Sequence, residues 1–268
     1  MRVRKFIVYF VLIIVSFICL FWVYTLFINA TRGGSDMYGL RLVPSVHLMD
    51  NLWGILDSAY PVVSSMKNSI FISVVSAAGC VYFASLCAYG FHMFKFPCKK
   101  FLFVFLLIVM MIPAQVSILG YADLARKMKL VDSLWSVILP RMAVPITFYY
   151  IYQFMSINVS KAYIEAARID GAGEMHIFHS IIFPLLKHAV AVQFIFEFVN
   201  NWNSFFIPAV LLTSDSKKTM SVVVTLLREV DAGAEYAMMA IAILPITIMY
   251  VLLSKQVING ITAGGIKE

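Results

Sequence analysis

The chain has little charge for its size. Asp, Glu, Lys and Arg make up 13% of its 268 residues, whereas 62% are hydrophobic. Soluble domains usually have about a quarter of their residues charged, so the composition excludes an ordinary soluble domain. Several apolar runs of about 20 residues place the chain among membrane proteins instead. The net charge of +7 does not favour nucleic acid as a partner, because most Lys and Arg residues lie at the ends of these runs, where they orient membrane spans.

Motifs for covalent chemistry are also missing. The sequence contains no G-x-x-x-x-G-K-[ST] loop for nucleotide phosphates, no G-x-S-x-G and no H-E-x-x-H. Its four cysteines show neither zinc-type spacing nor a disulfide framework. His176 and His179 stand on one helical turn without the rest of a metal motif. We therefore expect no catalytic residue, no metal site and no cofactor in this chain.

Six apolar runs are long enough to cross about 30 Å of hydrocarbon at about 1.5 Å per residue. They cover residues 6–28, 69–91, 101–121, 134–155, 188–212 and 237–257. The sequence predicts an all-α polytopic membrane protein with both termini on one side. The first run exceeds the roughly 7–15 apolar residues of a signal peptide, so we interpret it as a retained span. The basic clusters MRVRK and KFPCKK favour cytosolic N- and C-termini.

These runs divide the chain into two parts. Residues 1–67 form a first spanning helix and a long extracytoplasmic loop that we expect to contain one short surface helix. Residues 68–268 form a core of five spans, with a cytosolic loop at 156–187 between the fourth and fifth spans and a cytosolic tail at 258–268. Small residues such as Ser76, Ala77 and Gly79 in the second span predict a helix that packs closely against its neighbours.

The most polar stretch, EAARIDGAGEMHIFHSIIFP, covers residues 165–184. Ser160 is a suitable N-cap for a helix over 161–169, and Asp170-Gly171 predicts a turn. A second short helix over 173–183 should end or kink at Pro184. The product would be two short helices at an angle, projecting into the cytosol. A loop that merely returned the chain would need neither an Ala-rich helix nor a fixed glycine break.

This stretch resembles the EAA loop of permease subunits of ATP-binding-cassette importers, whose pattern is E-A-A, three residues, G, nine residues and I-x-L-P. The matching positions are Glu165, Ala166, Ala167, Gly171, Ile181 and Pro184, with Phe183 in place of the usual Leu. The resemblance implies coupling helices that dock into a cleft on a separate ATPase. Of the two carboxylates beside the motif, we assign partner contact to Glu165 and local helix capping to Asp170.

The C-terminal stretch 244–268 resembles the end of maltose-type sugar permeases, in the subunit that ends N-G-x-T-A-G-G-x-K. Gly264, Gly265 and Lys267 match this pattern, which implies a tail that reaches toward the ATPase dimer; a flexible terminus without a role is the alternative. The resemblance covers roughly residues 68–268 and implies the fold of binding-protein-dependent importer permeases in a bacterial inner or plasma membrane. It also implies a heterodimer with a second homologous permease, a cytosolic ATPase dimer that uses ATP and Mg, and an extracytoplasmic sugar-binding protein.

Polar residues interrupt the fifth apolar run. They are Glu197, Asn200, Asn201, Trp202 and Asn203. An ionised carboxylate within the hydrocarbon is costly and usually faces a bundle interior or a wet cavity. Carboxylates and amides beside an aromatic ring suit sugar hydroxyls, so these residues are candidates for a substrate path. Two alternatives stay open, namely hydrogen bonds between helices and a position near the membrane interface. Related sugar permeases often have an acidic residue where this chain has Ser204, so no particular cargo is predicted.

The sequence as a whole predicts a permease subunit of an ATP-driven, binding-protein-dependent importer for carbohydrate, which forms the translocation path without covalent chemistry. The same architecture with a non-sugar, sugar-phosphate or polyol cargo is the first alternative. An integral membrane enzyme and a secondary transporter that needs no ATPase are further alternatives. A secondary transporter would keep its activity when the loop at 165–184 is damaged.

Overall fold

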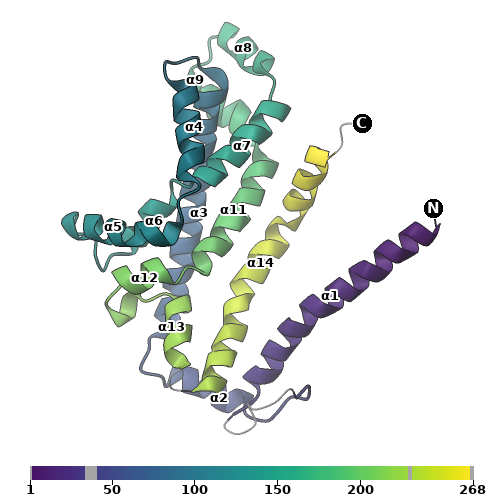
Figure 1. The fold of residues 1–268 in the computed structure, drawn as a ribbon, viewed down its shortest axis with the longest axis vertical. Helices are drawn as coiled ribbons and strands as arrows, with labels where there is room; N and C mark the ends of the chain where they lie inside the picture. Colours follow the sequence, from purple (N-terminus) through teal and green to yellow (C-terminus); the bar gives the residue numbers. More distant parts are fainter. Residues whose placement is uncertain (1, 34–40, 229–230, 266–268) are drawn as a thin grey trace. The chain divides into compact units, whose positions relative to one another are not determined.

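The computed structural model describes residues 2–33, 41–228 and 231–265, and every regular element among them is a helix (Figure 1). The predicted all-α class is confirmed. Four helices within the described chain are long and apolar enough to cross a membrane: Lys5–Ala30, Val62–Met93, Leu134–Asn158 and Ala232–Gln256. A bent pair, Glu174–Leu185 with Lys187–Trp202, makes a possible fifth. The chain is therefore multi-pass, whereas the count of six spans stays a prediction.

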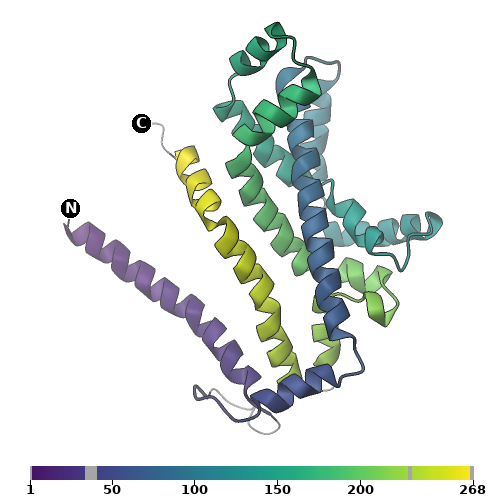
Figure 2. The ribbon, with the colours of Figure 1, turned by 180° about the vertical axis from the view of Figure 1, so that it is seen from behind.

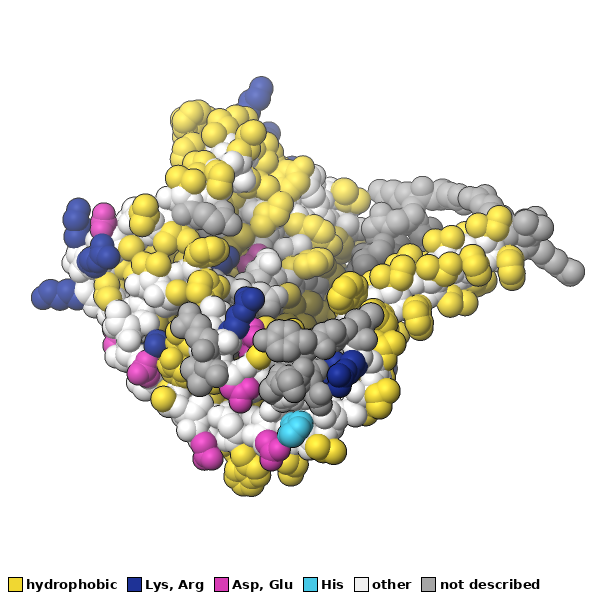
Figure 3. Space-filling model, turned by 60° about the horizontal axis from the view of Figure 1, so that its bottom comes forward, with side chains coloured by type: hydrophobic (Ala, Val, Ile, Leu, Met, Phe, Trp, Pro, Cys, Tyr) yellow, Lys and Arg dark blue, Asp and Glu magenta, His cyan; other side chains and the backbone are white. Residues whose placement is uncertain are grey.

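The chain divides into two compact units that differ from the division expected at residue 67. Unit 1 consists of Met1–Val63 and Val222–Leu244, and unit 2 of Ser64–Ser221 and Pro245–Glu268. A segment late in the sequence thus joins the N-terminal part. Hydrophobic side chains cover much of the surface drawn in Figure 3, as expected for a protein whose helices face lipid.

Unit 1 contains α1 (Arg2–Ala30), α2 (Leu48–Leu56) and the beginning of α14 (Ala232–Gly265). The helix α2 is the short helix predicted within the outer loop. Its buried Asn51 donates from Nδ2 to the carbonyl oxygens of Ala30 and Arg32, at 2.8 and 2.7 Å. These bonds hold the end of α1 and the residues after it against α2. A Cβ atom at Gly233 would lie 2.5 Å from Oδ1 of Asn51, so glycine permits the close approach of α14.

Unit 2 contains the functional elements. These helices are α4 (Lys99–Val109), α5 (Ala114–Lys127), α6 (Leu134–Arg141), α7 (Pro145–Asn158), α11 (Lys187–Trp202), α12 (Phe206–Leu211) and nearly all of α3 (Val62–Met93). The short helix α13 (Met220–Leu227) begins at the end of this unit, and its residues from Val222 onward belong to unit 1. Figure 2 shows α3 extending along the other helices of this unit. The prediction that α3 packs closely is confirmed, because Ser76 and Ala77 are fully buried and a Cβ atom at Gly79 would lie 2.7 Å from Cε of Met142.

Three predicted spans are broken helices. The run 101–121 is interrupted between Val109 and Ala114, the run 134–155 between Arg141 and Pro145, and the run 188–212 after Trp202. A proline follows or flanks each break: Pro113, Pro145 and Pro208. Proline has no N–H to continue the helical ladder, and its ring clashes with the carbonyl four residues earlier. The sequence predicts kinks at Pro113, Pro208 and Pro245. The structure has breaks near the first two and none at Pro245, which lies within α14. The helices α6 and α7 together still form one candidate span, Leu134–Asn158.

A charged clamp fixes the loop between α5 and α6. Asp132 has a positive φ of 59°, and its carboxylate accepts hydrogen bonds from the N–H groups of Thr213 and Ser214 at 3.0 and 2.9 Å. The ammonium group of Lys217 lies 3.0 Å from Oδ2 of Asp132. The hydrogen bonds from Ser214, and then the contact with Lys217, hold the pKa of Asp132 far below its usual range. The clamp joins this loop to the segment after α12.

Candidate functional site

The loop predicted at 156–187 contains a capped helix, α8 (Lys161–Ile169). Oγ of Ser160 accepts a hydrogen bond from the N–H of Ala162 at 3.3 Å, so the predicted N-cap and the predicted helix bounds are confirmed. The helix ends before Gly171, whose φ is +81°. This left-handed conformation suits glycine, and a Cβ atom there would meet nothing within 4 Å. Glycine is therefore needed for the backbone angle rather than for space.

The second half of the loop is one short helical stretch of three parts. These are α9 (Glu174–Ile177), the π-helical segment η2 (Phe178–Ile182) and α10 (Phe183–Leu185). The chain then bends by 78° at Leu186 into α11. Pro184 lies in the first turn of α10, which ends one residue later at Leu185, so the predicted end or kink lies close to this proline. The wider π-helical turn before it gives room to the carbonyl groups that a proline ring would otherwise contact.

One face of the loop packs on the transmembrane helices. Ile164, Ile177, Phe178 and Ile182 are fully buried and belong to one hydrophobic cluster with residues of α3 and α7. Figure 1 places α8 and α9 at the end of unit 2 opposite α12. A displacement of the loop would therefore be transmitted directly to α3 and α7, since protein interiors are close-packed.

The opposite face of the loop is exposed. Glu165 and Ala166 of the EAA motif lie on it, together with Asp170. Ile169 is 87% exposed, and Tyr163 and Met175 are more than half exposed. Exposed hydrophobic residues within a polar rim often mark a protein interaction site. The loop thus presents an exposed face that combines apolar side chains with charges of both signs, since Lys161 is exposed one turn before Glu165.

A polar strap joins the two halves of the loop to α3. Nε of Arg168 donates to Oε1 of Glu174 at 2.7 Å, and the hydroxyl of Tyr89 donates to Oε2 of the same carboxylate at 2.5 Å. The Arg168 guanidinium also lies 5.6 Å from the centre of the Phe94 ring, within the range of a cation–π contact. The sequence analysis missed this strap, although Arg168 and Glu174 have opposite charges on either side of the predicted turn.

The remaining positions of the motif have different environments. Ala167 is buried against the transmembrane helices, Ile181 is half-buried and Pro184 is exposed. Asp170 is the C-cap residue of α8, and its backbone N–H donates to the carbonyl oxygen of Ala166. The role of its side chain in capping stays a prediction. Gly264 and Gly265 are the last residues of α14, and Lys267 lies outside the described residues.

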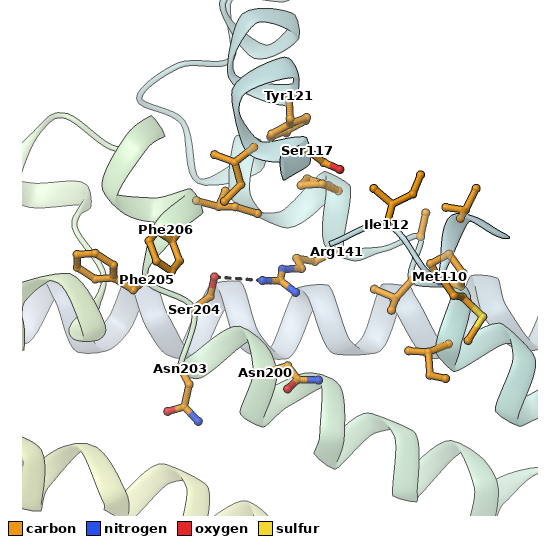
Figure 4. Close-up of a pocket in the computed structure, with 18 residues that line it drawn as sticks. Met110, Ile112, Ser117, Tyr121, Arg141, Asn200, Asn203, Ser204, Phe205 and Phe206 are labelled. Carbon is orange, nitrogen blue, oxygen red and sulfur yellow. Dashed lines mark hydrogen bonds between the residues drawn. The ribbon is translucent and has the colours of Figure 1, made fainter. Parts of the chain in front are cut away.

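A second site is a cavity of about 940 Å³ in unit 2 (Figure 4). Its wall comes from residues within 109–121, 140–146 and 200–207, which include all three breaks in the predicted spans. Asn200 and Asn203 line it, as does Ser204. Backbone that leaves the helical ladder at membrane depth is tolerated where it lines a cavity. The broken helices and the cavity are therefore one feature of the fold.

The predicted substrate-path residues separate into two groups. Asn200 and Asn203 line the cavity, whereas Glu197, Asn201 and Trp202 are buried and do not belong to its wall. Oε1 of Glu197 accepts a hydrogen bond from the hydroxyl of Thr147 at 2.7 Å, which joins α11 to α7. The role of all five in a substrate path stays a prediction, and the contact of Glu197 is of the kind expected from a residue that holds helices together.

Arg141 is a cavity residue that the sequence analysis missed. It lies at the end of α6, and its Nη2 donates to Oγ of Ser204 at 3.2 Å; Figure 4 shows its guanidinium group between α6 and the segment after α11. One signal was available, because Arg141 is the single Asp, Glu, Lys or Arg within the apolar run 134–155. Such residues inside spans usually have functional roles.

Comparisons with known proteins agree on one family. Residues 80–258 match the family described as the inner membrane component of binding-protein-dependent transport systems. The chain is 30% identical over 262 residues to the arabinooligosaccharides transport system permease protein AraQ of Halalkalibacterium halodurans, covering 94% of this chain and 93% of AraQ. It is 27% identical over 256 residues to the sn-glycerol-3-phosphate transport system permease protein UgpE of Shigella flexneri, covering 91% of each.

A solved structure has the same fold. It is a bacterial ABC transporter involved in the import of the acidic polysaccharide alginate, and the match has a TM-score of 0.79 with 19% sequence identity. The match covers 95% of this chain and 96% of the solved chain. At this identity the likeness shows the fold alone.

Proposed function

Since this chain belongs to the inner membrane components of binding-protein-dependent transport systems, we propose that it forms the translocation path of an ATP-driven importer for carbohydrate. Membership of the family makes it a multi-pass transport subunit rather than an enzyme. Members of this family work with a separate ATPase and with a binding protein. The proposal adds the cargo class, the docking surface and the arrangement of the subunits.

The cargo class is supported by the names of the relatives. AraQ is named for arabinooligosaccharides, UgpE for sn-glycerol 3-phosphate, and the solved transporter for alginate. Two of these cargoes are chains of sugars, and the third is a phosphorylated polyol. A carbohydrate is therefore the cargo that we propose for this chain, and a sugar phosphate or polyol phosphate remains the alternative within the same architecture.

The exposed face of the cytosolic loop is the observation on which the coupling role rests. We assign the docking contact to Glu165, Ala166 and Ile169, because they lie on the uncovered face of α8 while its other face is packed on α3 and α7. ATP and Mg are used by the partner ATPase and not by this chain. Closure of the ATPase dimer would move α8 and α9, and the packed face would carry that motion to the spanning helices.

The remaining partners follow from the resemblance of the sequence to sugar permeases. We propose a heterodimer with a second homologous permease, cytosolic N- and C-termini, and a sugar-binding protein on the outer side. Gly264, Gly265 and Lys267 would extend toward the ATPase dimer. None of these arrangements requires a cofactor bound to this chain.

A single charge on the docking face tests the coupling role. Ile169→Glu places a carboxylate where an apolar side chain is 87% exposed, and burying an unpaired charge at an interface is strongly unfavourable. We expect this variant to reach the membrane at normal levels. The amount of ATPase that co-purifies with it should be about tenfold lower than with the unchanged chain. Met128→Glu, a change of the same kind at the exposed end of α5, is the matched control.

The comparison of the two variants decides the result. Loss of the ATPase in Ile169→Glu alone supports docking at α8. If both variants retain the ATPase and the same ATP-driven uptake, the exposed face of α8 is not the docking surface.

A further inference from the structure

The cavity has one formal charge on its wall. Among the described residues that line it, Arg141 is the only Asp, Glu, Lys or Arg. The others that carry polar side chains are neutral, namely Ser117, Tyr121, Asn200, Asn203 and Ser204. The wall is therefore apolar with a few neutral hydrogen-bonding groups and a single cation.

Most of the donor capacity of this cation is unused. A guanidinium group has five N–H donors in a fixed plane. Nη2 of Arg141 donates to Oγ of Ser204 at 3.2 Å, and Nε is buried without a hydrogen-bond partner. None of the ion pairs among the described residues includes Arg141. The buried carboxylate of Glu197 has its hydrogen bond with Thr147 instead.

A buried guanidinium group with unused N–H donors is unfavourable unless another group accepts hydrogen bonds from it. Charged side chains within membrane spans usually pair with one another or face a water-filled cavity in which they meet an ion or a substrate. Guanidinium groups are particularly suited to carboxylate and phosphate groups, because two parallel N–H donors match two oxygen atoms. The carboxylate of Glu197 is near enough to interact electrostatically with Arg141. It forms no ion pair with Arg141 among the described residues, however, and it does not line the cavity.

We propose that the cavity selects an anionic carbohydrate and that Arg141 binds its carboxylate or phosphate group. Asn200, Asn203 and Ser204 lie on the same wall and offer donors and acceptors to the hydroxyl groups of the cargo (Figure 4). Phe205 and Phe206 supply apolar ring surface for the C–H face of a sugar. This inference rests on the proposed function and narrows its cargo to acidic sugars or sugar phosphates.

The charge of the cavity can be measured without transport or a known cargo. Asn203→Cys, in a chain whose four native cysteines are replaced by alanine, places a thiol on the cavity wall. The membranes are then treated with two thiosulfonate reagents of similar size, one carrying a sulfonate and one a quaternary ammonium group. The quantity measured is the labelling rate of the anionic reagent divided by that of the cationic reagent. Because the positive charge of Arg141 attracts the anionic reagent, we expect this ratio to fall about tenfold in Arg141→Gln.

Two controls accompany this measurement. Arg141→Lys keeps the charge and should keep most of the rate ratio, which also shows that the site tolerates substitution. Met128→Cys, at the exposed end of α5 and outside the cavity wall, should show a ratio that does not depend on residue 141. The proposal would be overturned if the rate ratio at position 203 were the same with Arg141 and with Arg141→Gln, or if neither reagent reacted there.

Protection of the same thiol identifies the anion in the Arg141 chain. A galacturonic acid disaccharide is compared with the neutral galactose disaccharide, and glycerol 3-phosphate is compared with glycerol. We expect the anionic member of at least one pair to slow labelling at about tenfold lower concentration than its neutral partner, and the pair that does so distinguishes carboxylate from phosphate. Equal protection by both members of each pair, or none by any probe, would contradict the proposal. Because neither measurement uses ATP, this result is separate from any failure of ATP-driven uptake.

Discussion

Gly171 determines the angle between the two halves of the loop at 156–187. Its φ of +81° lies in the left-handed region, which costs roughly 1–2 kcal/mol for a residue with a Cβ atom. Gly173, two residues later, has a φ of −73°, which any residue adopts. A Cβ atom at either position would meet nothing within 4 Å, so the two glycines differ in backbone conformation and not in space.

This difference gives a matched pair of substitutions. Gly171→Ala should strain the turn, displace α8 from α9 and lower ATP-driven uptake several-fold, while the protein remains in the membrane. Gly173→Ala should leave uptake close to normal. Both are measured as initial uptake rates normalised to the amount of chain in the membrane. Equal uptake by the two variants would show that the left-handed turn is not needed for coupling.

At the scale of elements, the strap on Glu174 connects α9 with α8 and α3. Its carboxylate accepts from both Arg168 and Tyr89, and a hydrogen bond to a charged group contributes about 1.5–3 kcal/mol. The Arg168–Glu174 pair is partly exposed, so solvent screening places its own contribution near the lower end. The strap makes the loop move with α3 rather than independently of it.

Loosening the strap should separate ATP hydrolysis from transport. Tyr89→Phe removes one hydrogen bond but keeps the ring that packs on Phe178, so we expect normal assembly with the ATPase. Uptake per ATP hydrolysed should fall by about two- to tenfold. Tyr149→Phe is the control, because the hydroxyl of Tyr149 forms no hydrogen bond with the described part of the chain. If Tyr89→Phe keeps the full ratio of uptake to hydrolysis, the strap does not transmit motion.

The sequence predicted the ends of some helices to the residue and those of others only approximately, because only some helix ends are determined by local signals. The bounds of α8 were predictable because a Ser N-cap and a left-handed glycine are local signals. The breaks in the spans were not, because a proline in a membrane helix is compatible with a kink as well as with a complete interruption. The charge of Arg141 within its apolar run was visible in the sequence. Its place on the cavity wall was not, because the three segments that form the wall meet only in the fold.

At the scale of the whole molecule, the central claim is that this chain converts the motion of a separate ATPase into movement of a carbohydrate across the membrane. The chain supplies a loop with one packed and one uncovered face and a cavity formed where its helices are broken. A membrane enzyme would require a group of reactive side chains instead, and a secondary transporter would not require the uncovered face of α8.

The most direct test is purification of the tagged chain from its own membranes in mild detergent, followed by reconstitution into vesicles and measurement of carbohydrate uptake with and without ATP. We predict that an ATPase and a second multi-pass permease co-purify, and that uptake requires ATP together with a sugar-binding protein on the outer side. If the chain purifies alone and moves its cargo without ATP, the claim is contradicted.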